Sequence, residues 1–257
     1  MPYVTFNGSQ YHYLANMPEG NKEPKQAIIF IHGSGGSSAH WQNQISFLGG
    51  DFLAIAVDLP GHGLSGGKLF SSIEEYSEFI DYFSERVIGF PFFLAGHSMG
   101  GAVALEYGLN YPEKLAGLIL IGTGSRLRVL PAILEAFKNG DIPLNMANYL
   151  YRQETPEAFL AAAREEMGKT GPAVFYSDLS ACNNFDLTGR LGEINLPALV
   201  ITGDKDLMTP EKYGKFLADN LKNAAFEKIT DAGHMLMLEQ PGKVNSSILD
   251  FLVKYSK

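Results

Sequence analysis

One serine of this chain lies in a sequence context that can make a hydroxyl group reactive. It is Ser98, within residues 96–101 (Gly-His-Ser-Met-Gly-Gly), between an apolar run that predicts a strand and a segment that predicts a helix. A chain that turns from strand to helix in so few residues leaves no room for side chains two positions before and two positions after the apex, and both positions are glycine. Such a turn exposes the hydroxyl above the strand end. The backbone N–H of Met99 then lies at a helix N-terminus, where partial positive charge gathers and an oxyanion can bind.

A serine hydroxyl is a weak nucleophile until a base takes its proton, and the chain has six histidines. We expect His12 at the surface of an N-terminal hairpin. His32 and His62 lie in glycine-containing turns, where a structural hydrogen-bonding role is expected. His97 is next to the serine in the turn, so its side chain leaves in another direction, and His40 lies in a loop from which it could line a pocket.

The sixth histidine, His234, is the candidate base, because it follows the last predicted strand in the loop 231–234 (Asp-Ala-Gly-His). A base of this kind needs an acceptor for its second ring N–H, which holds the tautomer and stabilises the imidazolium. Asp204 and Asp206 both follow the preceding predicted strand and are both candidates for that acceptor.

The elements that must position these side chains alternate along the chain. Short apolar runs, some continuous, predict about eight strands, over residues 2–6, 10–14, 27–31, 52–57, 92–95, 115–121, 198–202 and 225–229. Helical patterns lie between them over residues 73–88, 102–111, 210–221 and 240–255. Such alternation predicts an α/β fold, with a mostly parallel central sheet and helices on both of its faces.

Residues 125–191 break the alternation. They contain no buried-strand run, and helical patterns cover residues 131–139, 144–152, 156–167 and 173–181. We therefore expect a core of residues 1–124 and 192–257 with an inserted helical cap over 125–191. The insertion is either a packing subdomain or a lid over a site, and its Leu, Met and aromatic side chains favour an apolar roof. Arg126 and Arg128 are either exposed loop residues or ligands for a substrate carboxylate.

With these elements assigned, the sequence resembles the α/β-hydrolase superfamily over nearly its whole length. Residues 32–36 (His-Gly-Ser-Gly-Gly) look like its oxyanion loop, and residues 58–63 look like the turn after the next central strand. Residues 203–206 and 232–234 look like its acid and base loops. The resemblance implies the fold of that superfamily, with about eight strands and an inserted helical cap.

The resemblance also implies a role for each candidate residue. The triad would be Ser98, Asp206 and His234, in the chain order of the fold. Asp206 is preferred to Asp204 because the fourth residue counted from Gly203 carries the role in the resembled pattern. Some members carry the acid after the preceding strand, but residues 121–124 here hold no carboxylate.

The backbone N–H groups of Ser34 and Met99 would bind the oxyanion. The implied activity is that of a carboxylesterase cleaving small to medium apolar esters through an acyl-enzyme, with no cofactor and no metal. A serine at the turn argues against the epoxide hydrolase and haloalkane dehalogenase branches, which use aspartate there. The same apparatus serves lactones, thioesters, C–C cleavage and perhydrolysis, and a non-catalytic ligand-binding protein is the alternative of another class.

Composition excludes several other classes of function. The chain has 257 residues and a formal net charge of −8, so nucleic acid and anionic membranes are poor partners for it. Cys182 is the only cysteine, which excludes an intrachain disulfide and a cysteine-based zinc site. No apolar run approaches the roughly 18 residues of a membrane span, and residues 1–16 lack a signal-peptide pattern. We expect a cytoplasmic protein with a small ester-like substrate, and no pattern points to a particular oligomeric state.

Overall fold

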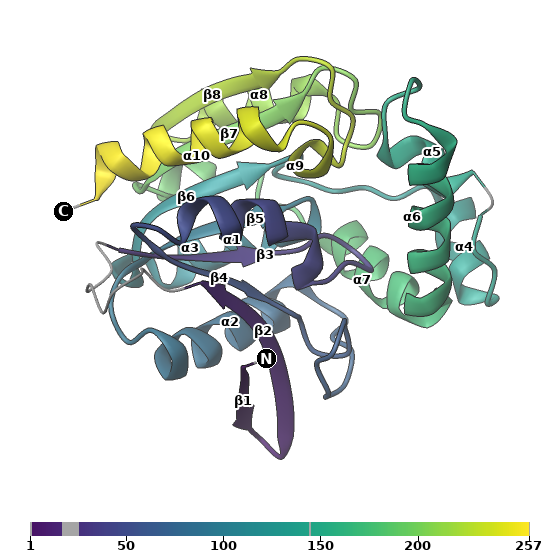
Figure 1. Cartoon of the computed structure of the whole chain (residues 1–257), viewed down its shortest axis with the longest axis horizontal. Helices are drawn as coiled ribbons and strands as arrows, with labels where there is room; N and C mark the ends of the chain where they lie inside the picture. The colour runs from purple at the N-terminus through teal and green to yellow at the C-terminus, as the bar shows by residue number, and fades with distance from the viewer. Residues whose placement is uncertain (1, 17–25, 144, 257) are drawn as a thin grey trace.

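The strands form a single sheet. The computed structural model describes residues 2–16, 26–143 and 145–256, so Leu144, at the start of one predicted helix, lies outside the described residues. The strand order is β1-β2-β4-β3-β5-β6-β7-β8. The strands are β1 (Tyr3–Phe6), β2 (Ser9–Asn16), β3 (Ala27–Ile31), β4 (Leu53–Val57), β5 (Phe92–His97), β6 (Leu115–Ile121), β7 (Pro197–Gly203) and β8 (Asn223–Ile229). β2 pairs antiparallel with β1 and β4, and all other pairs are parallel, which confirms the mostly parallel sheet (Figure 1).

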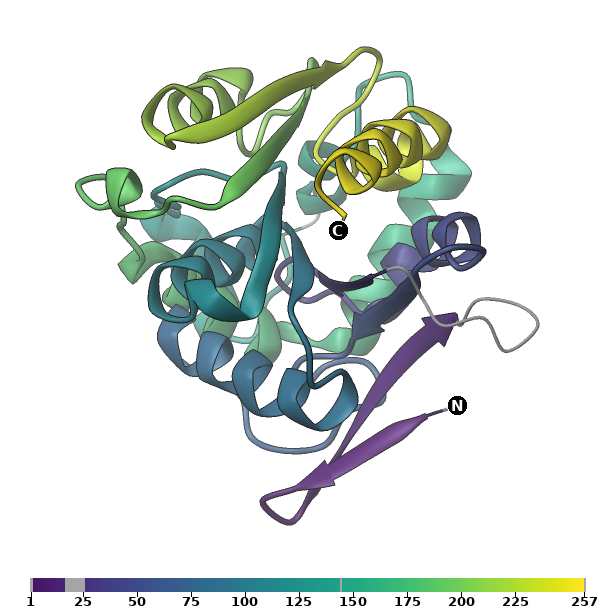
Figure 2. The same ribbon diagram turned by 90° about the vertical axis from the view of Figure 1, so that its left-hand side faces the viewer.

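Helices cover both faces of this sheet, as predicted (Figure 2). One face carries α2 (Ile73–Val87), α3 (Met99–Asn110) and α8 (Glu211–Asn220), and the other carries α1 (Gln42–Leu48) and α10 (Pro241–Tyr255). Strand side chains alternate between the two layers: Ile29 and Ile31 face the first, and Ile28 and Phe30 face the second. β3 and β4 are buried along their whole length, which explains why their sequences are continuously apolar.

Two elements differ from the expectation. Helix α3 begins at Met99, three residues before the predicted start at Ala102, because β5 turns into it directly at Ser98. No pattern in the sequence predicts α1, since seven residues make only two turns and are too few to display a helical period. The short helix α9 (Leu236–Glu239) and single 3₁₀ turns at Ser38–Trp41, Pro112–Lys114 and Leu191–Glu193 are the remaining elements of the described residues.

Four helices lie between β6 and β7 in the chain. They are α4 (Pro131–Lys138), α5 (Met146–Leu150), α6 (Glu157–Thr170) and α7 (Pro172–Asn184), and they gather beyond the carboxyl ends of the parallel strands (Figure 1). The two ends of this insertion are joined. The N–H of Leu187 donates to the carbonyl of Ser125 over 2.8 Å, and Arg126 and Asp186 form an isolated bridge. The insertion therefore leaves and re-enters the rest of the chain at one place.

The surface position expected for His12 is wrong. Its side chain is buried, with 2% of its area exposed, and its Nδ1–H donates to Asp58 Oδ2 over 2.7 Å. β2 pairs antiparallel with β4, and this pairing brings the hairpin residue beside the turn that follows Val57. Asp58 also accepts the backbone N–H groups of Ser38 and Leu64. A single carboxylate therefore joins strand β2, the 3₁₀ turn that begins at Ser38 and the loop after β4.

Asp58 is held as a carboxylate by these donors. Burial raises the pKa of Asp58, but the hydrogen bonds from Leu64 and Ser38 outweigh it and leave the pKa below its ordinary value. An acid whose pKa is lower in the folded state than in the unfolded state contributes stability above its unfolded pKa. That contribution is lost as the pH falls through the folded-state pKa.

We expect Asp58→Asn to lower the free energy of unfolding by about 2–4 kcal/mol at pH 7, because its amide leaves buried N–H donors without an acceptor. The difference from the wild type should shrink as the pH falls below about 4, because the carboxyl of the unfolded wild-type chain takes up its proton there, before that of the folded protein does. Urea unfolding at both pH values measures this. Asp250→Asn, at an exposed position, is the control and should stay within about 0.5 kcal/mol. An Asp58→Asn protein as stable as this control would contradict the assignment.

Candidate active site

The turn at Ser98 has the strained backbone that the glycine pattern predicts. Ser98 lies between β5 and α3 with φ 52° and ψ −115°, backbone angles that residues other than glycine rarely adopt. Its N–H donates to the carbonyl of Ile121 over 2.9 Å, and its carbonyl accepts the Thr123 hydroxyl over 2.8 Å. A Cβ on Gly96 would overlap the Gly100 carbonyl. The turn therefore requires glycine for steric reasons.

Asp206 and His234, the pair that the family resemblance implies, meet in the structure. The Nδ1–H of His234 donates to Asp206 Oδ2 over 2.9 Å, and both side chains are buried. The Thr209 hydroxyl donates to the same oxygen, and the N–H groups of Met208 and Thr209 donate to the other, each over 2.8 Å. Burial raises the pKa of Asp206, but the His234 ring and the Thr209 donors outweigh it and hold the pKa below its ordinary value. An ionised carboxylate only accepts, so the proton stays on Nδ1 and Nε2 is left as the acceptor.

Asp204 lies apart from His234. Its side chain is exposed and accepts the N–H of Ala232 over 3.3 Å, across the base of the neighbouring loop. The sequence leaves these two aspartates as alternatives for the acceptor, and the structure distinguishes between them. Asp206 reaches the histidine, and Asp204 holds the loop that carries it.

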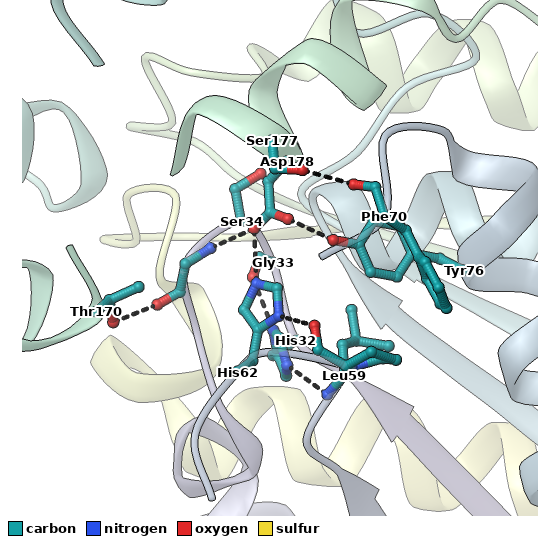
Figure 3. Close-up of polar contacts among 12 residues, drawn as sticks. His32, Gly33, Ser34, Leu59, His62, Phe70, Tyr76, Thr170, Ser177 and Asp178 are labelled. Carbon is teal, nitrogen blue, oxygen red and sulfur yellow. Dashed lines mark hydrogen bonds and ion pairs between the residues drawn. The ribbon is translucent and has the colours of Figure 1, made fainter. Parts of the chain in front are cut away.

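The loop after β3 is fixed from the core side by His32. The Nδ1–H of His32 donates to the carbonyl of Gly33 over 2.8 Å, while Nε2 accepts the N–H of Leu59 over 3.1 Å (Figure 3). Burial and the neighbouring His62 lower the pKa of His32 to about 3, so the ring is neutral and keeps this tautomer. The carbonyl and N–H of one trans peptide point in opposite directions. Holding the Gly33 carbonyl therefore turns the N–H of Ser34 away from His32.

A second N–H group lies at the start of α3. Met99 is the first residue of that helix, and the first N–H groups of a helix have no partner within it. Gly33 lies close to the turn, since a Cβ on Gly33 would come within 3.2 Å of the Ser98 Cβ. The N–H groups of Ser34 and Met99 thus belong to two segments that meet beside Ser98.

One mostly apolar cavity lies beside Ser98. Ser34, Ser98 and His234 lie on its wall, and the space free to the centres of water-sized molecules is about 80 Å³. The insertion supplies much of the opposite wall, with Met146, Leu150, Tyr151, Ala163, Met167, Phe175 and Leu179. The polar part of the cavity lining includes His40, which the sequence suggested as a pocket residue. The His40 Nε2 lies 2.9 Å from Glu166 Oε1.

His97 has a contact that the sequence does not reveal. Its Nε2–H donates to the backbone carbonyl of His234 over 2.9 Å, and the two rings lie 4.6 Å apart between centroids. Burial and the His234 ring lower the pKa of His97 well below its ordinary range, so the ring is neutral. His97 thereby supports the backbone that carries His234. The only sign of this supporting role in the sequence is the position of His97 beside Ser98, in a turn with little space.

Other candidate residues lie away from the cavity lining or are unreactive. Arg126 and Arg128 are half exposed and face Asp186 over 3.8 and 3.7 Å, which fits the reading as exposed loop residues. Cys182 is buried, and burial raises the pKa of its thiol to about 12, so it is no competing nucleophile. Within the described ranges, no group of three or more His, Cys, Asp or Glu side chains gathers as a metal site requires. None of the described helices is long and apolar enough to span a membrane.

Comparisons with known proteins identify the family and the fold. The model of the Alpha/beta hydrolase family matches residues 28–246. A solved thermophilic esterase is 32% identical, with a TM-score of 0.87 over 99% of this chain and 97% of that one. The enol-lactonase from Burkholderia xenovorans LB400 is 22% identical, with a TM-score of 0.89 over 98% and 100%, a likeness of fold. The 2-hydroxy-6-oxononadienedioate/2-hydroxy-6-oxononatrienedioate hydrolase of Paraburkholderia phymatum is 28% identical over 89% of this chain and 87% of that protein.

We expect Gly96→Ala to lower the free energy of unfolding by about 1–3 kcal/mol, because the added methyl group overlaps backbone that has nowhere to move. Gly242→Ala is the matched control, since a Cβ there meets nothing within 4 Å. Its stability should be unchanged or raised by up to about 1 kcal/mol. Urea unfolding measures both. A Gly96→Ala protein as stable as the control would show that the turn tolerates a side chain.

Proposed function

The chain belongs to the alpha/beta hydrolase family, and on that premise we propose that it is a serine hydrolase that cleaves small carboxylic esters. One observation carries the proposal. Ser98, on its strained turn, shares a cavity with His234, and Asp206 holds the ring of that histidine. The 32% identity to a thermophilic esterase over 99% of the chain supports an ester as the substrate.

The proposed reaction gives each of these groups a role. Ser98 Oγ attacks the ester carbonyl as His234 Nε2 takes its proton, and the carbonyl oxygen becomes an oxyanion. The N–H groups of Ser34 and Met99 bind that oxyanion. The imidazolium, held by Asp206, gives its proton to the leaving alcohol. Water then enters and attacks the acyl carbon as the same histidine takes its proton. The acid leaves as the bond to Ser98 Oγ breaks, and the histidine returns the proton to that oxygen.

The cavity supports a short, uncharged substrate. The space free to the centres of water-sized molecules is about 80 Å³, well below the roughly 300–1,000 Å³ usual for ligand pockets, so the cavity favours a small group. Among the described residues that line the cavity, none is arginine or lysine, which disfavours a substrate with a free carboxylate. In this proposal the helical insertion, residues 125–191, is a cap that encloses the short acyl group over the core formed by the rest of the chain.

A panel of p-nitrophenyl esters tests the proposal. We expect kcat/KM to be highest for acetate to butanoate and to fall for octanoate and longer chains, which exceed the cavity. Ser98→Ala should lower kcat by at least about 10⁴-fold. A lactone and a thioester complete the panel, and a preference for either of them would reassign the bond that is cleaved. Undiminished turnover by Ser98→Ala, or tight binding with no turnover, would contradict the proposal.

The two aspartates give a matched pair for the second test. Asp206→Asn should lower kcat by about 10⁴-fold, the loss seen in a serine protease, because the amide favours the wrong tautomer of the histidine. Asp204→Asn removes a charge two residues away without touching His234, so we expect kcat to change less than about tenfold. Steady-state kinetics on the preferred ester measures both. A larger loss in Asp204→Asn would reverse the assignment.

A further inference from the structure

Both polar backbone groups of Gly35 are bound by the insertion. The Gly35 N–H donates to Asp178 Oδ2 over 2.8 Å, and the Gly35 carbonyl accepts the Thr170 hydroxyl over 3.0 Å (Figure 3). Thr170 ends α6 and Asp178 lies on α7. Gly35 directly follows Ser34, so the loop that carries the Ser34 N–H is held by the insertion on one side and by His32 on the other.

Asp178 gathers donors from three other parts of the chain. Its side chain is completely buried, and besides Gly35 it accepts His62 Nε2–H over 2.8 Å and the Tyr76 hydroxyl over 2.7 Å. His62 lies in the turn after β4 and Tyr76 on α2. Burial lowers the pKa of His62, but the Asp178 carboxylate raises it by more, which favours a charged ring facing the carboxylate. An unpaired buried carboxylate is costly, so these donors fix where α7 lies.

Close packing and a weak hydrogen bond to sulfur make the same connection. Gly35 has φ +66°, and a Cβ at this position would overlap the ring of Phe175 on α7. The Ser34 hydroxyl lies 3.8 Å from the Cys182 sulfur, on the same helix. Loop and helix α7 therefore fit so closely that movement of either one requires movement of the other.

We propose that Asp178 is a positioning residue that joins two events, the docking of the cap onto the core and the formation of the oxyanion site. The inference rests on the proposed function, in which the Ser34 N–H binds the oxyanion. If α6 and α7 moved away together, Gly35 would lose both hydrogen bonds. Ser34 would then be held from one side only, by His32 through the Gly33 carbonyl, and its N–H would be free to turn. The oxyanion site is then complete only while the cap encloses the cavity.

The test compares two neighbouring residues of α7. Asp178→Asn keeps the shape but replaces one carboxylate oxygen with an NH₂ group, which cannot accept a hydrogen bond, so Gly35 and His62 lose an ionised partner. We expect kcat on the preferred ester to fall by about 10²–10³-fold, as when an oxyanion donor is removed, with KM changed less than about threefold. Ser177→Ala is the matched control, because it removes a contact between cap and core, to the Phe70 carbonyl over 2.7 Å, that does not involve Gly35. Its kcat should stay within about threefold.

A second measurement separates positioning from a general loss of structure. A trifluoromethyl ketone forms an oxyanion on the serine, so its inhibition constant should rise by the same factor as kcat/KM falls in Asp178→Asn. Thr170→Val removes the other hydrogen bond to Gly35 and should lower kcat about 3–10-fold, which provides a test even if Asp178→Asn does not fold.

Three outcomes would overturn the inference. These are an Asp178→Asn kcat equal to that of Ser177→Ala, a loss confined to KM, or, should Asp178→Asn not fold, a Thr170→Val kcat equal to that of the wild type. If the wild-type protein shows no turnover that depends on Ser98, the proposed function fails instead.

Discussion

The backbone of Ser98 is the constraint on which the rest of the site depends. A non-glycine residue at φ 52° costs on the order of 1–3 kcal/mol and persists only where its surroundings enforce it. Here β5 lies between β3 and β6 in the sheet, and the chain must turn at once into α3. Since parallel strands end at one edge, the loops after β3, β6, β7 and β8 all reach the same turn. Every other group of the site is positioned relative to that one residue.

Three buried carboxylates hold separate segments of the chain together around this turn. Asp58 joins the edge hairpin to the turn after β4, Asp206 holds the ring of His234, and Asp178 connects the insertion to the loop after β3. Each accepts hydrogen bonds from segments that are far apart in the chain or from a loop that must not move. A buried charge is tolerated only where donors replace water. Because a buried carboxylate needs donors in fixed places, it also fixes the position of the loop that supplies them.

The parts of the fold and the site that could be predicted from the sequence are those that depend on neighbouring residues. The alternation of strands and helices and the turn at Ser98 depend on residues close in sequence, so composition and spacing predicted them. Asp204 and Asp206 could not be separated by spacing, and the resemblance to a family made that choice. The position of His12 and the partners of Asp178 could not be predicted. Gly35 and Asp178 are 143 positions apart, and no periodicity indicates which polar groups meet across such a separation.

The most direct test of a serine-centred site is the mass of the protein during turnover. A short p-nitrophenyl ester would be mixed with the enzyme, quenched in acid within milliseconds, and the whole protein and its peptides weighed. If Ser98 is the nucleophile, a transient species should carry one added acyl group, on the peptide that contains Ser98. The absence of any adduct during rapid turnover, or an acyl group on another residue of an active protein, would contradict it.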